Sequence, residues 1–355
     1  EWPAAAGRCQ GGADSRGAPS PPLLGAGPDT ASVLPLSARS EEALAALAAR
    51  YADHLSAGAV PGAEDEGLDA VCFSAATRRT HHAHRAVFRA DERAGMIEAL
   101  RKFAGGEAAA IQGVAATRPK IAFVFPGQGG QWLGMGRQLM ARMPAFRRAL
   151  EDCDSAARRH ADFSIIGQLM ALPDEPGGRH DDIDVVQPLL AAVEIAYARM
   201  WRSLGVEPDA VIGHSMGEVA AAYIAGVLSI DQAMQVICRR SALMRRASGR
   251  GAMALVGLSI DQAAQRLKGA GDSLGIAVDN GPGSSVVSGD PEAVARFIER
   301  LERDDVFARL IKVDVASHSA QMESQSVELT AELKGLRPSA ARVPIYSTVF
   351  GERAE

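Results

Sequence analysis

The sequence predicts an α/β protein: a parallel sheet with helices on both faces, an inserted α+β unit, and a smaller α/β unit ahead of the sheet. Short apolar runs alternate with amphipathic helical patterns from residue 118 onward. Residues 250–315 show the order strand, helix, strand, strand, helix, strand. A length of 355 residues with 47% hydrophobic content gives material for roughly two domains.

Charge and apolar patterning exclude several classes of protein. The 38 basic and 43 acidic residues give a formal net charge of −5, so no global basic field attracts phosphate backbones or anionic lipid. No window approaches ~18 uninterrupted apolar residues, and the N-terminus lacks the order of a signal peptide. We therefore expect a cytoplasmic protein that binds neither nucleic acid nor a membrane.

Cysteine and histidine spacing argues against a metal site or a disulfide framework. The four cysteines are scattered without a C-x-x-C pair and predict reduced core thiols: Cys9, Cys72, Cys153 and Cys238. His81, His82 and His84 cluster, but the arginines around them repel a divalent cation and no carboxylate is interleaved. A polar strand and turn is the preferred interpretation, a metal site is the alternative, and we expect no metal.

The first third of the chain predicts a linker followed by a small domain. Residues 1–31 are rich in Gly, Ala, Pro and Ser and predict a flexible linker. A small α/β domain is expected over 32–117, with Ser40 as a helix N-cap. Its expected strands are 33–38, 70–74 and 83–89, its second helix is 91–103, and 105–117 is expected to be a Gly- and Ala-rich connection.

The main domain is expected over 118–355, with a large subdomain formed by 118–249 and 316–355. Buried parallel strands are predicted at 121–125 and 210–212, and helices at 143–160, 189–204 and 218–225. The subdomain at 250–315 is predicted to be ferredoxin-like, with strands 253–258, 276–280, 284–288 and 310–315 and helices 260–267 and 291–301.

The strongest chemical motif is G-x-S-x-G at 213–217, which stands between a predicted buried strand and an Ala-rich helix. A strand that turns sharply into a helix holds such a serine in a strained conformation with its hydroxyl exposed. Ser215 is therefore the candidate nucleophile.

A serine hydroxyl needs a general base and an oxyanion hole. His318 is the candidate base because it follows a predicted strand, where loops at the carboxyl edge of a sheet meet; a structural role for this histidine is the alternative. The N–H of Met216 and one N–H from the loop 127–130 are the natural oxyanion donors.

Five motifs together resemble the malonyl-type acyltransferases, in particular the acyltransferase domain of polyketide synthases. They are FPGQGGQW at 125–132, GHSMGE at 213–218, RSALM at 240–244, VASH at 315–318 and YSTVFG at 346–351. The sequence after residue 33 also resembles the linker domain that joins ketosynthase to acyltransferase in such synthases.

The resemblance implies a role for each matched residue. Ser215 would carry the acyl ester and His318 would be the base. Gln128 and Met216 would form the oxyanion hole through their backbone N–H groups. Arg240 would bind the free carboxylate of the extender unit, which a planar guanidinium can hold bidentately; without the resemblance it would be interpreted as a helix-surface arginine.

The resemblance also implies the partners. The donor would be methylmalonyl-CoA or malonyl-CoA, and the acceptor would be the phosphopantetheine thiol of an acyl carrier protein. The ketosynthase domain of the same polypeptide would be a further partner. No cofactor is expected to be bound.

Extender selectivity is expected to depend on Met216, Val315, Ala316, Ser317 and Gln187. Malonyl-restricted relatives tend to carry HAFH where VASH stands here, and the small Ser317 leaves the space that a 2-methyl group needs. VASH and IDVVQ at 183–187 resemble the methylmalonyl type, whereas Met216 departs from the glutamine common at its position. Methylmalonyl is the expected extender and malonyl is the alternative.

Two other functions remain open from the sequence. A serine hydrolase or thioesterase would need an acidic triad member, for which Asp231, Asp279 and Asp314 are available. An inactive structural module of a synthase is the other alternative. Relatives continue beyond the YSTVFG motif, so the resemblance implies a domain truncated at its C-terminus.

Overall fold

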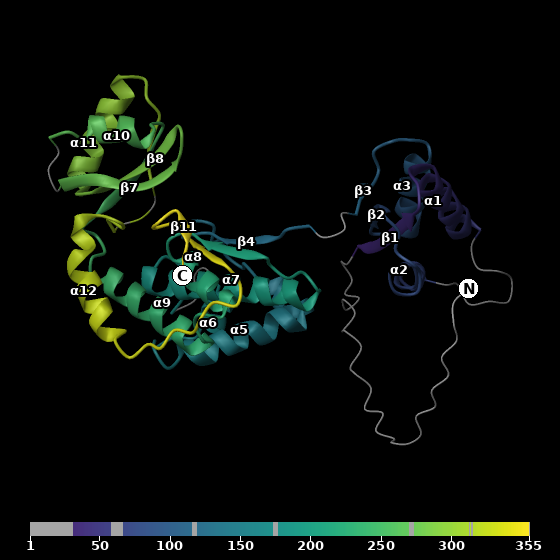
Figure 1. Ribbon diagram of the computed structural model, residues 1–355, viewed down its shortest axis with the longest axis horizontal. Helices are drawn as coiled ribbons and strands as arrows, with labels where there is room; N and C mark the ends of the chain where they lie inside the picture. Colours follow the sequence, from purple (N-terminus) through teal and green to yellow (C-terminus); the bar gives the residue numbers. More distant parts are fainter. Residues whose placement is uncertain are drawn as a thin grey trace, which may run out of the picture. The chain divides into compact units, whose positions relative to one another are not determined.

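The computed structural model divides the chain into two compact units, Glu1–Pro119 and Lys120–Glu355 (Figure 1). It describes residues 31–57, 67–115, 119–172, 177–269, 273–311, 313 and 315–354. The linker predicted over 1–31 lies outside the described residues except for its last position.

The first unit is a three-stranded antiparallel sheet with three helices. Its elements are β1 (Ser32–Ala38), α1 (Glu41–Ser56), α2 (Leu68–Thr77), β2 (His84–Ala90), α3 (Arg93–Ala104) and β3 (Ile111–Val114), and the sheet order is β1-β2-β3. Ser40 caps α1 as predicted, since its side chain accepts from the N–H of Ala43 at 3.2 Å. Leu34, Phe88 and Met96 are fully buried in the core.

Two predicted elements of this unit are wrong. The strand expected at 70–74 is part of helix α2, in which Val71, Cys72 and Ala75 are buried at helical spacing. A short apolar run fits either structure, so periodicity could not separate them. The connection expected over 105–117 contains β3, whose four residues are all exposed and so lack the alternation that marks a half-buried strand.

The large subdomain of the second unit contains a four-stranded sheet of order β11-β10-β5-β4. Strands β4, β5 and β10 are parallel, and β11 is antiparallel at the edge. The strands are β4 (Ala122–Phe125), β5 (Ala210–Gly213), β10 (Ile345–Ser347) and β11 (Glu352–Arg353). The helices are α4 (Arg137–Arg142), α5 (Pro144–Ala157), α6 (Ile165–Met170), α7 (Ile183–Ser203), α8 (Gly217–Ala225), α9 (Ile230–Arg245), η2 (Ala320–Met322) and α12 (Glu323–Glu332).

Helix α7 begins six residues before the predicted start at 189 and contains Pro188. Proline has no N–H to donate to the carbonyl of Asp184, one turn earlier. The Ser241 hydroxyl on α9 donates to that carbonyl at 3.4 Å. The same hydroxyl lies closer to the carbonyl of Cys238, at 3.1 Å, and its single proton can be donated to only one of the two carbonyls at a time. Helix α7 continues through Pro188 while packed against α5 and α9.

The sheet is covered on one face by α8, which contacts β4, β5 and β10. On the opposite face Val124, Ile212 and Tyr346 are paired in register, and Val124 and Tyr346 are exposed. The α/β fold class is confirmed, but among the described residues this second face does not carry the helix layer that strand–helix alternation predicts.

The inserted subdomain is ferredoxin-like, as predicted. Its elements are β6 (Ala252–Val256), α10 (Ile260–Arg266), β7 (Leu274–Gly281), β8 (Ser284–Gly289), α11 (Pro291–Arg303) and β9 (Ala308–Leu310). The antiparallel sheet order β7-β8-β6-β9 places the first strand between the third and fourth. Strand β9 is shorter than the predicted 310–315, and Val315 and Ala316 beyond it are buried.

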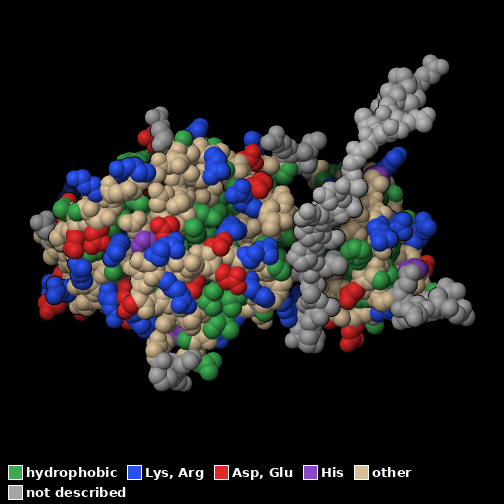
Figure 2. Space-filling model, turned by 90° about the horizontal axis from the view of Figure 1, so that it is seen from below, with side chains coloured by type: hydrophobic (Ala, Val, Ile, Leu, Met, Phe, Trp, Pro, Cys, Tyr) green, Lys and Arg blue, Asp and Glu red, His purple; other side chains and the backbone are tan. Residues whose placement is uncertain are grey.

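Cysteine and surface features agree with a buried-thiol protein of mixed surface charge. Cys72, Cys153 and Cys238 are free and buried, as predicted, and burial raises the pKa of each thiol; Cys9 lies outside the described residues. None of the described helices could cross a membrane. Over the second unit, at left in Figure 2, acidic and basic side chains are interspersed on the visible face.

Helix α7 carries a buried carboxyl group without a partner. Glu194 is 9% exposed, and neither carboxyl oxygen has a hydrogen-bond partner among the described residues. Burial raises the pKa of this carboxyl from 4.5 to about 8. The folded state therefore binds a proton that the unfolded state releases between these two pKa values, and stability must fall as pH rises through that window.

We expect Glu194→Leu to stabilise the protein by about 3 kcal/mol at pH 7, because each unit of pKa shift corresponds to ~1.4 kcal/mol. The gain should be small near pH 4.5 and largest above pH 8. Urea unfolding followed by tryptophan fluorescence at several pH values measures it. Glu194→Gln is the matched control, since it keeps a buried polar group but removes the pH dependence; a pH-independent difference between Leu variant and wild type would contradict the assignment.

Candidate active site

The G-x-S-x-G motif forms a tight turn between β5 and α8. Ser215 has a φ of 53°, in the left-handed region, which holds the residue in a strained position at the head of α8. A Cβ added to Gly213 would lie 2.3 Å from backbone atoms of Glu218, and one added to Gly217 would lie 2.3 Å from the carbonyl oxygen of Phe125. Glycine is therefore required on both sides of the serine.

The structure brings Ser215 and His318 together. The Oγ of Ser215 lies 3.0 Å from Nε2 of His318, which is hydrogen-bond distance for a nucleophile and its base. His318 also has a positive φ, 58°. The Ser319 hydroxyl donates to the carbonyl of Ala316 at 2.7 Å and holds the turn that presents the imidazole.

Electrostatics keep the His318 imidazole neutral and ready to accept a proton. Partial burial and the nearby charges of Arg240 and His214 lower the pKa of His318 below its usual value. No carboxylate of the described residues forms a hydrogen bond with His318. Asp231 pairs with Arg159 and His160, which places it in another interaction.

Of the two other candidate acids, Asp279 is described and forms no hydrogen bond with His318. Asp279 accepts from the N–H of Gly281 at 3.0 Å, within its own turn. Asp314 lies outside the described residues. In the described part of the chain Ser215 and His318 therefore form a dyad.

Two backbone N–H groups are free to bind an oxyanion. Among the described residues, no group accepts a hydrogen bond from the N–H of Met216 or from that of Gln128. The loop that carries Gln128 packs on the serine turn, because the N–H of His214 donates to the carbonyl of Phe125 at 2.8 Å. A Cβ on Gly127 would lie 2.9 Å from Nδ1 of His214. This approach places both donors beside the serine turn.

Arg240 supplies a positive charge near the dyad. Its guanidinium donates to Oε1 of Gln187, and burial lowers the pKa of Arg240. Within the described ranges no carboxylate pairs with it, unlike Arg245 five residues later on α9, which pairs with Asp182 and Asp184. A partly buried cation that lacks a counter-ion is suited to bind a carboxylate from a substrate.

Gln187 joins the charge of Arg240 to the oxyanion loop. Its Oε1 accepts from Arg240, while its Nε2 donates to Oε1 of Gln128 at 3.2 Å and approaches the sulfur of Met244 at 3.6 Å. Gln187 itself is only 3% exposed. One buried amide therefore orients the cation and the side chain next to the expected oxyanion donor.

Two supporting interactions escaped the sequence reasoning. Arg245 forms ion pairs with Asp182 and Asp184, and these pairs tie the start of α7, which carries Gln187, to the end of α9. Arg179, just before α7, pairs with the same two carboxylates. The sequence does show acidic residues at the start of α7 and arginines at the end of α9. It does not show that these two helix ends lie next to each other.

The second interaction fixes the serine turn from the other side. Glu218 accepts from the hydroxyl of Ser347 at 3.0 Å and from the N–H of Thr348 at 2.8 Å. The Thr348 hydroxyl donates to the carbonyl of Gly213 at 3.0 Å. Ser347 and Thr348 belong to the YSTVFG motif at 346–351, to which the sequence alone assigns no role. In the structure this motif holds the turn around Ser215 in place.

The expected selectivity residues differ in position. Val315 is fully buried in a small apolar cluster with Ile183 and Met244. Ala316 is 1% exposed against Gly251, and Met216 is 1% exposed. Ser317, next to His318, is partly exposed, so its side chain is the accessible one of the VASH motif besides the histidine.

The comparison with known families covers both units. A family model described as "Acyl transferase domain" matches residues 122–355, and one described as "CurL-like, PKS C-terminal" matches residues 32–100. Polyketide synthase GfsB of Streptomyces halstedii is 43% identical over 321 residues, which are 90% of this chain and 6% of that protein. The chain therefore spans a small part of the curated relatives it matches.

Solved structures match as well. The acyltransferase domain from module 8 of the salinomycin polyketide synthase is 38% identical with a TM-score of 0.79, covering 92% of this chain and 76% of that one. The acyltransferase domain of SpnD in complex with 2-(pent-4-yn-1-yl)malonyl is 31% identical with a TM-score of 0.77, covering 92% and 75% respectively.

Proposed function

Because the chain belongs to the acyl transferase domain family and is an acyltransferase of the polyketide synthase type, we propose that it transfers methylmalonyl from CoA to the phosphopantetheine thiol of an acyl carrier protein. The observation that carries the chemistry is the 3.0 Å contact between Ser215 Oγ and His318 Nε2. The cycle uses no bound cofactor, since CoA and phosphopantetheine arrive with the substrates.

The first half-reaction forms the acyl-serine. Nε2 of His318 accepts the proton of Ser215 as Oγ attacks the thioester carbon, and the carbonyl oxygen becomes an oxyanion bound by the N–H groups of Gln128 and Met216. The carbon–sulfur bond then breaks, and the CoA thiolate leaves with the proton from His318. The Ser215 ester of the extender unit remains.

The second half-reaction runs the same steps in reverse order. The phosphopantetheine thiol gives its proton to His318, and its sulfur attacks the ester carbon of the acyl-serine. The same two N–H groups bind the oxyanion again. The Ser215 alkoxide leaves and recovers the proton from His318, which restores the free enzyme.

Arg240 selects dicarboxylic extenders in this proposal. Its guanidinium, uncompensated by any described carboxylate, would hold the free carboxylate of methylmalonyl throughout both steps. Plain acyl-CoA donors would leave this cation unpaired, which disfavours them.

The choice of methylmalonyl over malonyl rests on the small Ser317 and on a relative. Ser317 is partly exposed beside His318, where a larger side chain would occupy the space of a 2-methyl group. The SpnD domain, 31% identical, was solved with a malonyl that carries a 2-substituent. A pocket that merely has room for a methyl group discriminates by ~1–3 kcal/mol, so some malonyl transfer is expected.

We expect Ser317→Phe to reverse the extender preference. The phenyl ring would fill the space of the 2-methyl group and lower methylmalonyl loading about 10- to 100-fold, with malonyl loading changed much less. Intact-protein mass spectrometry after brief incubation with each CoA thioester measures the acyl adduct. Ser317→Ala is the control; a wild-type preference for malonyl, or equal losses for both donors in the Phe variant, would contradict the assignment.

A further inference from the structure

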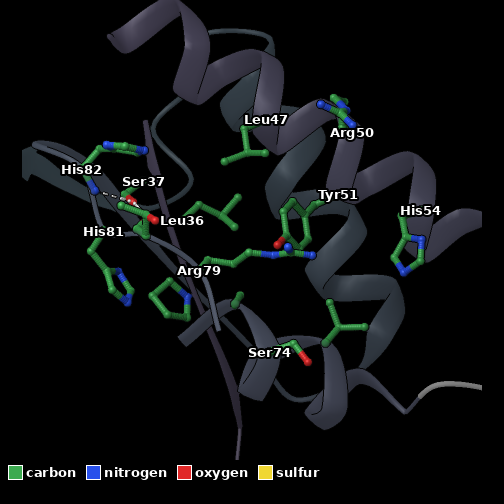
Figure 3. Close-up of a pocket in the computed structure, with 14 residues that line it drawn as sticks. Leu36, Ser37, Leu47, Arg50, Tyr51, His54, Ser74, Arg79, His81 and His82 are labelled. Carbon is green, nitrogen blue, oxygen red and sulfur yellow. Dashed lines mark hydrogen bonds between the residues drawn. The ribbon is translucent and has the colours of Figure 1, made fainter. Parts of the chain in front are cut away.

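The first unit contains an open groove that the proposed acyl transfer does not use. The groove has a volume of about 720 Å³ and lies between α1, β1 and the loop that joins α2 to β2 (Figure 3). It is formed entirely by residues of the first unit.

One wall of the groove is a single face of α1. Leu47, Arg50, Tyr51 and His54 line it at the spacing i, i+3, i+4 and i+7, which places them in one row along the helix. At 1.5 Å rise per residue this row is ~10 Å long, about the length of three extended residues.

The other wall is a loop held in a defined position. The Ser37 hydroxyl of β1 donates to the carbonyl of Thr80 at 3.2 Å and accepts from the N–H of His82 at 2.9 Å. His81 Nε2 lies 2.9 Å from the carbonyl of Ala76 at the end of α2. This loop presents Arg79, whose side chain extends across the groove toward Tyr51 in Figure 3. The wall is therefore preformed by hydrogen bonds.

The charge of the groove has one sign. Its lining includes two arginines and three histidines and no Asp or Glu. Arg50 and Arg79 are both exposed, and neither forms an ion pair with any residue in the described part of the chain. Guanidinium groups stay charged at any physiological pH and bind carboxylates through paired N–H groups.

The groove also offers apolar surface on the α1 wall. Leu47 and Tyr51 are partly buried there, whereas Leu36 and Val71 of the lining are almost fully covered by the core. A small phosphate would contact the arginines and leave Leu47 and Tyr51 in water, whereas a peptide that alternates acidic and apolar side chains could contact both.

We propose that this groove binds an acidic, extended segment of the synthase polypeptide from outside these 355 residues. Its carboxylates would pair with Arg50 on α1 and with Arg79, which reaches across the groove from the loop, and an apolar side chain between them would contact Leu47 and Tyr51. The matched relatives leave ample polypeptide for such a segment, since the aligned region is 6% of the GfsB length.

The test uses the whole chain and a fluorescein-labelled peptide of sequence Glu-Leu-Glu-Leu-Glu, with binding followed by fluorescence anisotropy. Two exposed guanidinium–carboxylate pairs together contribute ~10-fold to affinity, and reversing the charges adds repulsion. The double variant Arg50→Glu with Arg79→Glu should therefore weaken peptide binding at least ~10-fold. Arg78→Glu with Arg89→Glu is the matched control: it makes the same change of net charge on exposed residues of the same unit that do not line the groove.

Each outcome decides the proposal. Loss of binding in the groove variant alone, together with weaker binding of Gln-Leu-Gln-Leu-Gln and Glu-Ser-Glu-Ser-Glu, supports it. No binding to the wild-type chain, equal weakening in the control variant, or full displacement by inorganic phosphate or by CoA would overturn it. Unchanged circular dichroism and unchanged acylation of Ser215 show that the variants are folded and that the acyl-transfer site is independent of the groove.

Discussion

Replacing His318 by alanine is expected to lower the rate of acyl-serine formation by ~10³-fold or more, and replacing Ser215 by alanine to abolish it. A general base within hydrogen-bond distance contributes ~10²–10⁴-fold to such a step. Nε2 of His318 is 3.0 Å from the hydroxyl of Ser215, which it must deprotonate. Among the described residues, no other basic side chain forms a hydrogen bond with this hydroxyl. Rapid-quench acylation with methylmalonyl-CoA and intact-protein mass spectrometry measure the rate.

The pH profile separates a catalytic role of His318 from a structural one. Only the neutral imidazole accepts the proton, so acylation must fall as pH drops through the pKa of His318. Because burial, Arg240 and His214 lower this pKa, the midpoint of the acidic limb should lie below pH 6.5, the usual value for histidine. His214→Asn removes one of these charges and should move the acidic limb to higher pH.

A remote histidine provides the control. His160 forms a hydrogen bond with Asp231 and none with Ser215 or His318, so His160→Gln should leave both the acylation rate and its pH profile unchanged. An acidic limb with its midpoint above pH 6.5 in the wild type, or acylation of Ser215→Ala at a second position, would contradict the assignment of the dyad.

The order of strands and helices around the serine could be predicted because local signals agree there. A buried strand, glycines on both sides of Ser215 and an Ala-rich helix each independently require the same turn, and Gly213 and Gly217 indeed leave no room for a Cβ. The ferredoxin-like subdomain was predictable for the same reason, since Ser259 and Asp290 cap its helices where the apolar pattern changes period.

Elements whose structure depends on distant contacts were not predictable. Helix α2 and strand β3 were misjudged because a short apolar run and a fully exposed edge strand lack a decisive period. The early start of α7, with Pro188 inside the helix, comes with packing against α5 and α9, which lie at distant places in the sequence. Tertiary contacts of this kind leave no mark in the local sequence.

The hydrogen bonds of Gln187 with Arg240 and Gln128 likewise depend on tertiary contacts that the local sequence does not show. Gln187 was expected to influence extender selectivity because its segment resembles that of the methylmalonyl type. The structure adds a physical function that the pattern could not show: the amide connects Arg240 to Gln128. That connection requires α7 and α9 to be packed together, and the pairs of Arg245 with Asp182 and Asp184 that support the packing also form only in the fold.

Replacing Arg240 by alanine is expected to lower kcat/KM for methylmalonyl-CoA by ~10²–10³-fold, because removing one partner of a desolvated charge pair costs about 2–5 kcal/mol. Propionyl-CoA has the same carbon skeleton without the carboxylate, so its slow transfer should be unchanged or faster. The ratio of the two kcat/KM values, measured by CoA release, reports the carboxylate contact alone.

The neighbouring arginine is the matched control for this experiment. Arg239 is exposed on the same helix and pairs with Glu332 at 3.6 Å, so Arg239→Ala should change neither substrate by more than about 2-fold. Equal losses for both thioesters in the Arg240 variant would indicate a structural arginine, and no loss for either would show that the carboxylate is bound elsewhere.

Gln187 then tests whether the orientation of Arg240 matters as much as its charge. Gln187→Ala removes the acceptor that holds the guanidinium and should raise KM for methylmalonyl-CoA by ~10-fold, with a smaller change in kcat, since a single hydrogen bond to a charged group is worth ~1.5–3 kcal/mol. Gln187→Glu has the same shape but places a carboxylate on Arg240, so it should compete with the substrate's own carboxylate and weaken methylmalonyl binding further. Because propionyl-CoA carries no carboxylate, its transfer should be insensitive to the choice between Gln and Glu; a parallel loss for propionyl-CoA in the Glu variant would mean that Gln187 acts on the oxyanion loop through Gln128 instead of on Arg240.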